Sequence, residues 1–401
     1  MLSFRTYQHC YALPARPFTA EDDTLAIGGG LCCDGVWITE SALFPSSLAS
    51  YDFDPGEADY VDDDVVFIGC MSPVWGHAVT DCLKQLWWLR TEDYKKNHAD
   101  KPLYYWGLKP LSGNFLELIR FAEVDISKLH FIDHVMLFRS VIVPDISFNY
   151  TKVWASEEYL DTIQLIISNS KPASCLDDGR GEQKVFLSER SGLRTWGVRN
   201  IEKVARRAGF TIYYPGEHTL QEQISVFRSA STVMSFESSI GHNTVFCRPG
   251  IRLIMIRKAN YVNKYQTIIN KLGAFDVTTV DANLSIMNDD RFPYAGPFFV
   301  YPNEALCQAI GLSPKQQEAC RFPRKLFGKY FRWIFWDGER SLAHRLSFSE
   351  HDTAILAHEI TKYRERQIKR ISKVFRYIPL PQRFKEKAIR KIAKYMVRHF
   401  I

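Results

Sequence analysis

The chain has 401 residues, of which 46% are hydrophobic and 24% charged, and its net charge is +6. This length predicts two or more domains, with enough apolar residues for two cores. There is no secretory pattern near the start, and no apolar run approaches the ~20 residues of a membrane span, so we expect neither a secreted nor a membrane-spanning protein.

The nine cysteines are predicted to be free thiols. Their number is odd, Cys32 and Cys33 are adjacent, and no pair has the Cys-x-x-Cys spacing. This distribution is typical of a reducing compartment and predicts neither a zinc site nor a disulfide framework. We therefore expect a cytoplasmic protein.

The positive charge is concentrated at one end of the chain. From Arg321 onward there are 21 Lys and Arg against 7 Asp and Glu, an excess of 14 positive charges. Since the net charge is +6, residues 1–320 carry about −8. The basic character of the chain therefore belongs to residues 321–401.

Residues 1–60 predict a β-rich lead-in. Short apolar runs alternate there with turn residues, and Asp34-Gly35 between two such runs is typical of a β-hairpin. The triple glycine at residues 28–30 is followed by neither a helix nor a lysine, so it indicates a flexible turn rather than a phosphate loop.

Three consecutive aspartates, residues 62–64, could hold a divalent metal ion. They precede the predicted strand 65–69 and so are expected at its amino end, whereas ligands of a parallel sheet bind at the carboxyl end. A solvated turn is therefore the favoured interpretation, and no metal site is predicted.

A helix is predicted over residues 72–89, where apolar residues recur at helical spacing. His77 and Asp81 are four positions apart near its start, so they share one face at the carboxyl end of a strand. Such a pair can act as an acid/base unit, with the carboxylate deprotonating a hydroxyl or orienting the imidazole. The alternative is a first-turn histidine beside an aspartate that compensates the helix dipole.

Strands and helices then alternate, which predicts an α/β fold with a parallel sheet. The predicted strands are 102–106, 130–132 and 140–144, and the predicted helices are 114–122 and 156–168. A polar segment at residues 171–183 is the candidate linker. The predicted domains are an N-terminal domain of residues 1–175, a second domain of residues 176–320, and a basic helical tail of residues 321–401.

A second alternating set begins at residue 184. It comprises the predicted strands 184–188 and 210–214 and the predicted helices 200–209 and 220–229. Arg190, Arg194 and Arg199 follow its first strand, and guanidinium groups at the carboxyl edge of a sheet can bind a diphosphate in bidentate fashion. A solvated basic loop is the alternative.

Residues 231–256 predict a strand, a tight turn, a short helix and another strand. Such a turn lies at the carboxyl end of a strand, where the ligands of α/β sheets bind. Ser238 and Ser239 are predicted to cap the helix, whose first N–H groups suit phosphate. Glu237 could bind a ribose hydroxyl, and His242 could donate to a diphosphate oxygen. The alternative is a Ser-rich N-cap before a helix-surface histidine.

Residues 281–320 show no regular pattern, and two helices are predicted beyond them, over 353–377 and 383–401. The last helix has an apolar stripe opposite lysines and arginines, which is typical of an interfacial helix on anionic lipid. A helix docked on its own protein is the alternative, but it would not explain the cationic excess.

Four segments carry a resemblance to a known family. Gly76-His77…Asp81 resembles a Gly-His-x-x-x-Asp helix start, with Val74-Trp75 in place of the usual Asn. Leu187-Ser188-Glu189-Arg190 resembles a strand that ends in Ser-Arg, with one Glu inserted, and the helix from Leu220 to Ala230 is similar to a Leu-Ser-x-x-Glu-Gln helix.

The fourth segment is the most specific. Glu237-Ser238-Ser239…His242-Asn243…Phe246 resembles a Glu-Gly-Ser/Thr-x-x-His-Asn-x-x-Phe motif, with Ser238 where Gly is common. Together the segments resemble glycosyltransferase family 61, the DUF563-like proteins, particularly its bacterial members in capsule and other surface-polysaccharide loci.

The resemblance covers about residues 25–260 and implies a GT-B-like fold, in which two Rossmann-like domains face a cleft and the second binds a nucleotide-sugar. It implies inversion at the anomeric carbon with neither a metal ion nor a cofactor. Asp81 is then the predicted base, and His77 orients it or the acceptor. The predicted donor-binding residues are Arg190, Arg194, Glu237, Ser238, Ser239, His242 and Asn243.

The sequence thus predicts a hexosyl- or pentosyltransferase that moves a sugar from a nucleotide-sugar donor to a hydroxyl of a lipid-linked or oligosaccharide acceptor. The basic tail is expected to hold it on the inner face of the cell membrane. The rival classes are a phosphotransferase or nucleotide hydrolase on the same scaffold, and a non-catalytic lipid- or nucleic-acid-binding protein. Nucleic acid is not expected, because the amphipathic stripe suits a membrane better.

Overall fold

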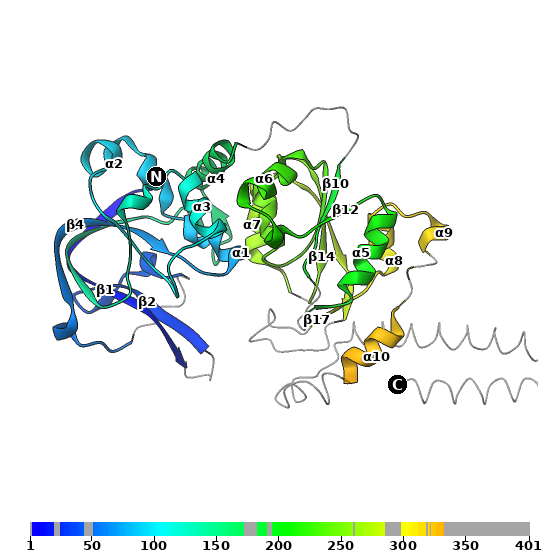
Figure 1. The fold of residues 1–401 in the computed structure, drawn as a ribbon, viewed down its shortest axis with the longest axis horizontal. Helices are drawn as coiled ribbons and strands as arrows, with labels where there is room; N and C mark the ends of the chain where they lie inside the picture. The colour runs from blue at the N-terminus through cyan, green and yellow to red at the C-terminus, as the bar shows by residue number, and fades with distance from the viewer. Residues whose placement is uncertain are drawn as a thin grey trace, which may run out of the picture. The chain divides into compact units, whose positions relative to one another are not determined.

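A computed structural model describes residues 2–19, 25–43, 51–171, 183–190, 195–259, 261–284, 298–317, 320 and 322–332. The chain divides into two compact units, and its elements are labelled in Figure 1. The first unit comprises Met1–Ser188, Tyr213–Met255 and Val262–Thr278, and the second comprises Glu189–Ile212, Ile256–Tyr261 and Thr279–Ile401. The predicted α/β class is confirmed, whereas the predicted domain boundaries after residues 175 and 320 stay predictions.

A seven-stranded mixed sheet organises the first half of the chain. Its order is β3 (Val36–Trp37), β2 (Leu25–Cys33), β1 (Phe4–Thr19), β7 (Met136–Pro144), β4 (Asp59–Cys70), β5 (Leu103–Trp106) and β6 (Leu129–Phe131). The pairs β3–β2, β2–β1 and β1–β7 are antiparallel, and β7–β4, β4–β5 and β5–β6 are parallel.

The predicted β-rich lead-in is confirmed as part of this sheet. Cys33 pairs with Val36 across a two-residue turn, in which Asp34 and Gly35 have φ angles of 51° and 75°. Two positive φ angles are what a type I′ hairpin turn requires, and Asp-Gly is a preferred pair for it. Figure 1 shows β1 and β2 as a long hairpin, and β1 joins the parallel strands through β7.

The parallel strands of this sheet have a topological switch point. In chain order β4 comes first, β5 and β6 follow on one side of it, and β7 lies on the other side. Ligands of α/β proteins bind beyond the carboxyl ends of the strands where the order reverses in this way. The segment that follows Cys70, at the carboxyl end of β4, is therefore a candidate position for a site.

The prediction that residues 62–64 precede their strand is wrong, because β4 begins at Asp59. The Arg139 guanidinium lies 3.1 Å from both Asp62 Oδ1 and Asp64 Oδ1. Lys101 Nζ lies 3.2 Å from Asp64 Oδ2, and this hydrogen bond lowers the pKa of Asp64. Neighbouring cations therefore pair with these carboxylates.

Two of the predicted helices in this half are confirmed as α3 (Asn114–Phe121) and α4 (Glu157–Asn169). The hydroxyl of Ser156 accepts a hydrogen bond from the Tyr159 backbone N–H and caps α4, as its sequence indicates. In chain order, a short helix, α2 (Glu92–Asn97), comes between β4 and β5.

The predicted continuous helix over residues 72–89 is wrong. The segment forms α1 (Trp75–Ala78) and two 3₁₀ helices, η3 (Asp81–Leu83) and η4 (Leu86–Arg90). Thr80 interrupts it: its backbone is not helical, and its hydroxyl donates to the Gly76 carbonyl at 2.8 Å. Residues 78–88 are all buried. The recurring apolar residues therefore reflect a segment that is enclosed on all sides, and not a helix that is buried on one face.

A five-stranded sheet organises the second half. Its order is β12 (Thr211–Tyr213), β10 (Lys184–Leu187), β13 (Thr232–Phe236), β14 (Arg252–Arg257) and β15 (Asp276–Asp281). In chain order this is 2-1-3-4-5, a doubly wound arrangement with its switch point between β10 and β13, which are parallel. The helices of this half are α5 (Val198–Arg207), α6 (Leu220–Ser229) and α7 (Lys264–Leu272).

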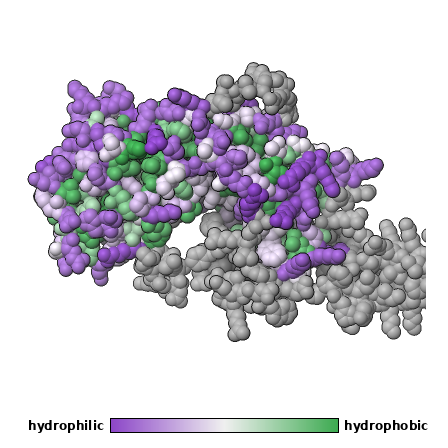
Figure 2. Space-filling view, in the orientation of Figure 1, coloured by the Kyte–Doolittle hydropathy of each residue, from purple (hydrophilic) through white to green (hydrophobic). Residues whose placement is uncertain are grey.

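Helix α6 begins and ends where the sequence predicts. Thr219 and Glu222 form a capping box, in which the Thr219 side chain accepts from the backbone of Glu222 and the Glu222 carboxylate accepts from the backbone of Thr219. Helix α5 is amphipathic: its exposed residues are hydrophilic in Figure 2, and its apolar residues are buried. The buried ones are Val198, Ile201, Val204 and Ala205.

The irregularity expected for residues 281–320 is only partly correct. A small sheet has the order β11 (Thr195–Trp196), β17 (Phe298–Val300) and β16 (Asn283–Leu284). Helices α8 (Glu304–Ala309), α9 (Pro314–Gln317) and α10 (Arg324–Arg332) follow. Gly197 lies against this sheet with a φ of 97°, and a Cβ there would lie 1.8 Å from the Val300 carbonyl oxygen. Only glycine allows this approach.

A hydrophobic cluster rich in aromatic residues holds α10 against the small sheet. Its buried members are Leu284, Phe299, Tyr301 and Tyr330. Trp196, Phe322, Leu326 and Phe327 pack against them. The first turns of the basic region are thus part of the second unit, while the predicted helices 353–377 and 383–401 lie outside the described residues.

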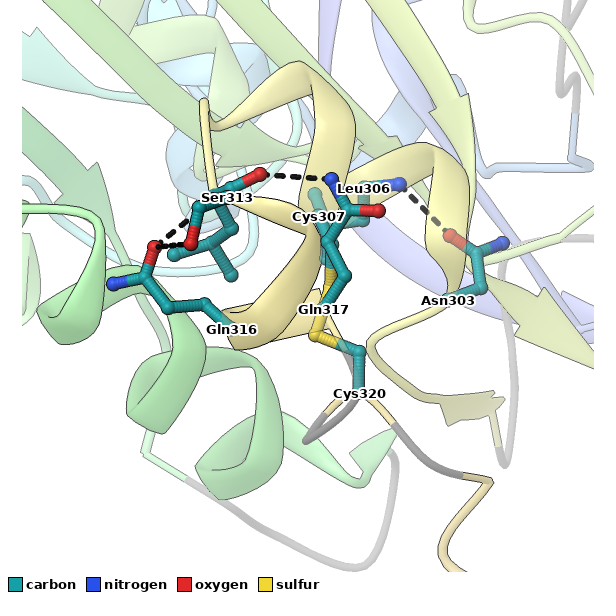
Figure 3. The surroundings of a disulfide bond; sticks show 8 residues. Asn303, Leu306, Cys307, Ser313, Gln316, Gln317 and Cys320 are labelled. Carbon is teal, nitrogen blue, oxygen red and sulfur yellow. Dashed lines mark hydrogen bonds between the residues drawn. A yellow bond between two sulfur atoms is a disulfide. The ribbon is translucent and has the colours of Figure 1, made fainter.

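A disulfide joins Cys307 on α8 to Cys320, with the two Cα atoms 7.0 Å apart (Figure 3). The prediction that all cysteines are free thiols is therefore wrong for this pair. The chain turns back between α8 and α9 and brings together two residues that are 13 apart in sequence, a spacing that carries no signal of pairing. The described free cysteines are Cys10, Cys32, Cys33, Cys70, Cys82 and Cys247.

Within the described part of the chain, none of the helices combines the length and the apolar character needed to cross a membrane.

Candidate active site

The structure brings His77 and Asp81 together at the carboxyl end of β4. His77 lies in α1, which follows this strand, and its Nδ1 atom is 2.8 Å from Asp81 Oδ2. The predicted proximity is therefore confirmed, although the two residues do not share a regular helix. The roles predicted for them stay predictions.

Burial distinguishes the two partners. The Asp81 side chain is 3% exposed, whereas that of His77 is 23% exposed. Thr80 Oγ1 lies 3.4 Å from the same carboxylate oxygen. A buried carboxylate that hydrogen-bonds to one imidazole nitrogen fixes the orientation of the ring. The second ring nitrogen, Nε2, then lies on the side of the ring away from the carboxylate. The imidazole of this pair is thus the more accessible group.

The segment after β13 is the second part of the site, and it corrects the predicted helix cap. Gly241–Phe246 forms a 3₁₀ helix, η7, whose preceding residue, Ile240, makes no side-chain capping bond. Ser238 and Ser239 therefore do not cap it: the Ser238 N–H turns back to the Phe236 carbonyl at 2.9 Å. A six-residue 3₁₀ helix does not have the strong dipole expected of a longer α-helix.

The segments after β4 and β13 are in direct contact within the first unit. Trp75 Nε1 donates to Asn243 Oδ1 at 2.7 Å, and His242 Nδ1 lies 3.4 Å from the Gly76 carbonyl oxygen. A Cβ on Gly76 would lie 2.8 Å from both His242 Nδ1 and Ser239 Oγ. The glycine before His77 is thus required by the close approach of these two segments.

Asn263, at the start of α7, connects Glu237 to His242. Its backbone N–H donates to Glu237 Oε1 at 3.0 Å, and its side-chain Nδ2 lies 3.3 Å from His242 Nε2. Its Oδ1 accepts from the Gln266 N–H at 3.2 Å and caps α7. Asn263 was not predicted from the sequence as a site residue, although an Asn immediately before an amphipathic segment is a recognisable N-cap.

Tyr265 is a second site residue that was not predicted from the sequence. Its ring lies 5.5 Å from the ring of His77 and 5.6 Å from that of His242. Tyr150 and Phe148, which follow β7, stack on it at 5.0 Å and 5.9 Å. The aromatic side chain thus packs against both histidines of the site, and nothing in its local sequence indicates this position.

His242 is expected to make the protein sensitive to acid. Burial lowers its pKa from 6.5 to about 4, so between these values the unfolded chain binds the additional proton. The contribution of His242 to stability is then complete above pH 6.5 and falls as the pH drops through 4, by up to roughly 3 kcal/mol. Urea unfolding at pH 7 and pH 4.5 should show a smaller difference for His242→Gln than for the unchanged protein. Equal pH dependence of the two proteins would contradict this assignment.

The predicted arginines belong to a different part of the chain. Arg190 is exposed, follows β10 and lies in the second unit, and Arg194 lies outside the described residues. Glu189, the residue inserted relative to the family pattern, pairs with the buried Lys258 at 3.1 Å within the second unit. Arg199 is exposed on α5.

No group of three or more His, Cys, Asp or Glu side chains in the described ranges is arranged to hold a metal ion.

Residues 75–254 match the family model Glycosyltransferase 61. Residues 75–254 belong to glycosyltransferase family 61. The matched region contains His77, Asp81 and the segment Glu237–Asn243, whereas Asn263 and Tyr265 lie beyond it. This match supports the resemblance of the motifs to family 61 over residues 75–254.

Among solved structures, the chain is similar to a dodecameric iron-containing heptosyltransferase, TibC, in complex with ADP-D-β-D-heptose. The identity is 11%, and the alignment covers 81% of this chain and 92% of that one, with a TM-score of 0.25. This likeness is too low to carry an argument. No curated protein matches the sequence significantly.

Proposed function

We propose that this family 61 glycosyltransferase moves a sugar, with inversion and without a metal ion, from a nucleotide-sugar donor to a hydroxyl of a glycan acceptor. A capsular or other surface polysaccharide is the acceptor class that the motifs favour. A hexose or a pentose is the transferred sugar.

One observation carries the proposal. The His77–Asp81 pair, at the carboxyl end of β4, lies in the same contact network as His242 and Asn243, at the carboxyl end of β13. Both positions are switch points of parallel strands, where α/β proteins bind their ligands. This arrangement supports a GT-B-like active site with an acceptor side formed after β4 and a donor side formed after β13.

The burial of the pair favours His77 as the group that contacts the acceptor. Inverting transfer needs a base that removes the acceptor proton while the diphosphate departs. The partly exposed imidazole can reach a hydroxyl, and the buried Asp81 carboxylate can hold it and stabilise the imidazolium that forms. Asp81 was the base predicted from the sequence, and its burial supports the opposite assignment of the two roles.

The donor side is proposed at Glu237, Ser238, Ser239, His242 and Asn243, whereas the diphosphate contacts predicted for Arg190 and Arg194 stay predictions. The first five residues directly follow β13, beside the switch point between β10 and β13. Polar groups there can stabilise the charge that develops on the leaving diphosphate, which is the task that a metal ion performs in other transferases.

A two-step experiment tests the proposed function. A thermal-shift screen against a panel of nucleotide-sugars identifies the donor, because a ligand that binds only the folded state raises its melting temperature. Incubation of that donor with glycan acceptors should release nucleoside diphosphate and join the sugar to the acceptor. Release of free sugar or of phosphate alone would favour a hydrolase or phosphotransferase. Loss of turnover in EDTA that manganese or magnesium restores would contradict the metal-free mechanism.

We also propose that the basic tail, residues 321–401, holds the enzyme on the inner face of the cell membrane. The support is its excess of 14 positive charges beside the apolar stripe of residues 384–400. Truncation before Pro379 should release the protein from anionic liposomes in a sedimentation assay and leave donor binding unchanged. Equal liposome binding by the truncated and full-length chains would contradict this function of the tail.

A further inference from the structure

The hydrogen bonds around Asn263 determine which nitrogen of His242 carries its proton. Asn263 Oδ1 accepts from the Gln266 backbone N–H at 3.2 Å, so the other half of the amide, Nδ2, faces His242. An amide NH₂ group can only donate, so His242 Nε2, 3.3 Å away, must be an acceptor. The proton of the neutral ring therefore lies on Nδ1.

In this tautomer the Nδ1–H group of His242 is a hydrogen-bond donor that faces α1, the helix that contains His77. The Nδ1–H group faces the Gly76 carbonyl oxygen at 3.4 Å, and Gly76 directly precedes His77 in α1. His242 is 5% exposed and Asn263 is 6% exposed, so water does not readily substitute for either bond. Both ring nitrogens are engaged, and in this state His242 connects two chain segments.

We propose that Asn263 is a positioning residue of the transferase: it holds His242 in the Nδ1–H tautomer, and this tautomer holds the Gly76 carbonyl and thereby the His77 segment. The inference deepens the proposed function and rests on it for the role of His77. The series of contacts runs from Glu237, which accepts from the Asn263 backbone N–H at 3.0 Å, to α1. It couples the proposed donor side to the proposed base.

The substitution Asn263→Asp should change the tautomer of His242 without removing the N-cap of α7. Aspartate is as good an N-cap as asparagine, so α7 keeps its cap. A carboxylate at this position accepts instead of donating, so a neutral His242 must move its proton to Nε2, and the Gly76 carbonyl then faces a bare nitrogen. The charged or titratable side chains that surround His242 are His77 and Asp81 on one side and Glu237 and Tyr265 on the other.

The tautomer is measured without substrate, by long-range ¹H–¹⁵N correlation spectra at pH 8 on histidine-labelled protein. The His242 signals among the eleven histidines are assigned by comparison with His242→Gln. We expect the Nδ1–H form in the unchanged protein and the Nε2–H form in Asn263→Asp. In a second sample with ¹³C-carbonyl-labelled glycine, we expect a shift of the Gly76 carbonyl resonance. If Asn263→Asp does not fold, Asn263→Ser keeps the cap, removes the amide NH₂ group that faces His242 and should populate both tautomers. An Nε2–H form in the unchanged protein overturns the proposal.

Turnover is measured on the same variants. The loss of the Gly76 hydrogen bond should lower kcat by on the order of tenfold, with little change in the KM of the donor. The matched control is Asn303→Asp, because Asn303 also caps a helix and also donates its amide to a carbonyl, that of Asp281. Unchanged kcat in Asn263→Asp despite the altered tautomer overturns the positioning role. Absence of transfer by the unchanged protein would refute the proposed function, while the spectra still decide the tautomer and its Gly76 contact.

Discussion

Replacement of His77 with alanine is expected to lower kcat by ~10²–10⁴-fold, the range typical of removing a general base. The side chain is 23% exposed and the carboxylate that holds it is buried, so the imidazole is the group that can reach an acceptor hydroxyl. The affinity for the donor, measured by isothermal titration with the nucleoside diphosphate, should change little. Added imidazole should restore part of the activity, because it can occupy the space of the missing ring.

Asp81→Asn tests the division of roles within the pair. An amide at this position can still hydrogen-bond to the imidazole, but it does not stabilise an imidazolium and can select the wrong tautomer. If His77 is the base, both variants lose turnover and only His77→Ala is rescued by imidazole. The control is His134→Ala, which removes an exposed histidine that is also paired with a carboxylate, that of Asp133. Near-normal turnover in His77→Ala would return the role of base to Asp81.

Replacement of Lys84 with alanine is expected to lower the free energy of unfolding by about 3–5 kcal/mol. Lys84 is 1% exposed, and its Nζ donates to the Ala42 carbonyl at 2.6 Å and the Leu43 carbonyl at 3.2 Å. Alanine would leave a cavity where the aliphatic chain lies, and it would leave the buried Ala42 carbonyl and the partly buried Leu43 carbonyl without their donor. The change should appear as a lower midpoint of urea unfolding with an unchanged slope.

Two variants separate the components of this effect. Lys84→Met keeps the volume but not the donor, so it isolates the hydrogen bonds, and Lys95→Ala removes a lysine whose side chain is 57% exposed and should have almost no effect. Burial lowers the pKa of Lys84 below its ordinary value of 10.5, so the unfolded chain binds more protons between the two values. The stability of the unchanged protein relative to Lys84→Met should therefore rise with pH up to about 10.5. A more stable Lys84→Met would show that desolvation of the ammonium outweighs its hydrogen bonds.

Local signals predicted much of the fold. Asp34-Gly35 specifies a turn with two positive φ angles, and Ser156 and the Thr219–Glu222 capping box specify the starts of α4 and α6. These features depend on residues within four positions of each other, so the sequence contains them in full. The alternation of strands and helices predicted the parallel strands for the same reason.

Predictions from local patterns were wrong for segments that contact neighbouring structure on several sides. Residues 78–88 have helical spacing, but they are enclosed by the surrounding structure and form 3₁₀ turns around Thr80. Ser238 and Ser239 have the composition of an N-cap, but their segment turns back on β13. A pattern of apolar residues records that a segment is buried, and the neighbours that bury it decide its backbone.

By itself the sequence determined the α/β class, the family motifs and the proximity of His77 to Asp81, because each depends on short spacings along the chain. Only the tertiary structure decided that Asp81 is the buried partner, that Asn263 lies against His242 and that Gly76 must lack a side chain. The contacts of Asn263 and Gly76 with His242 join residues that are 21 and 166 positions apart in sequence. Their geometry depends on how closely two sheet edges approach, and no local pattern specifies that distance.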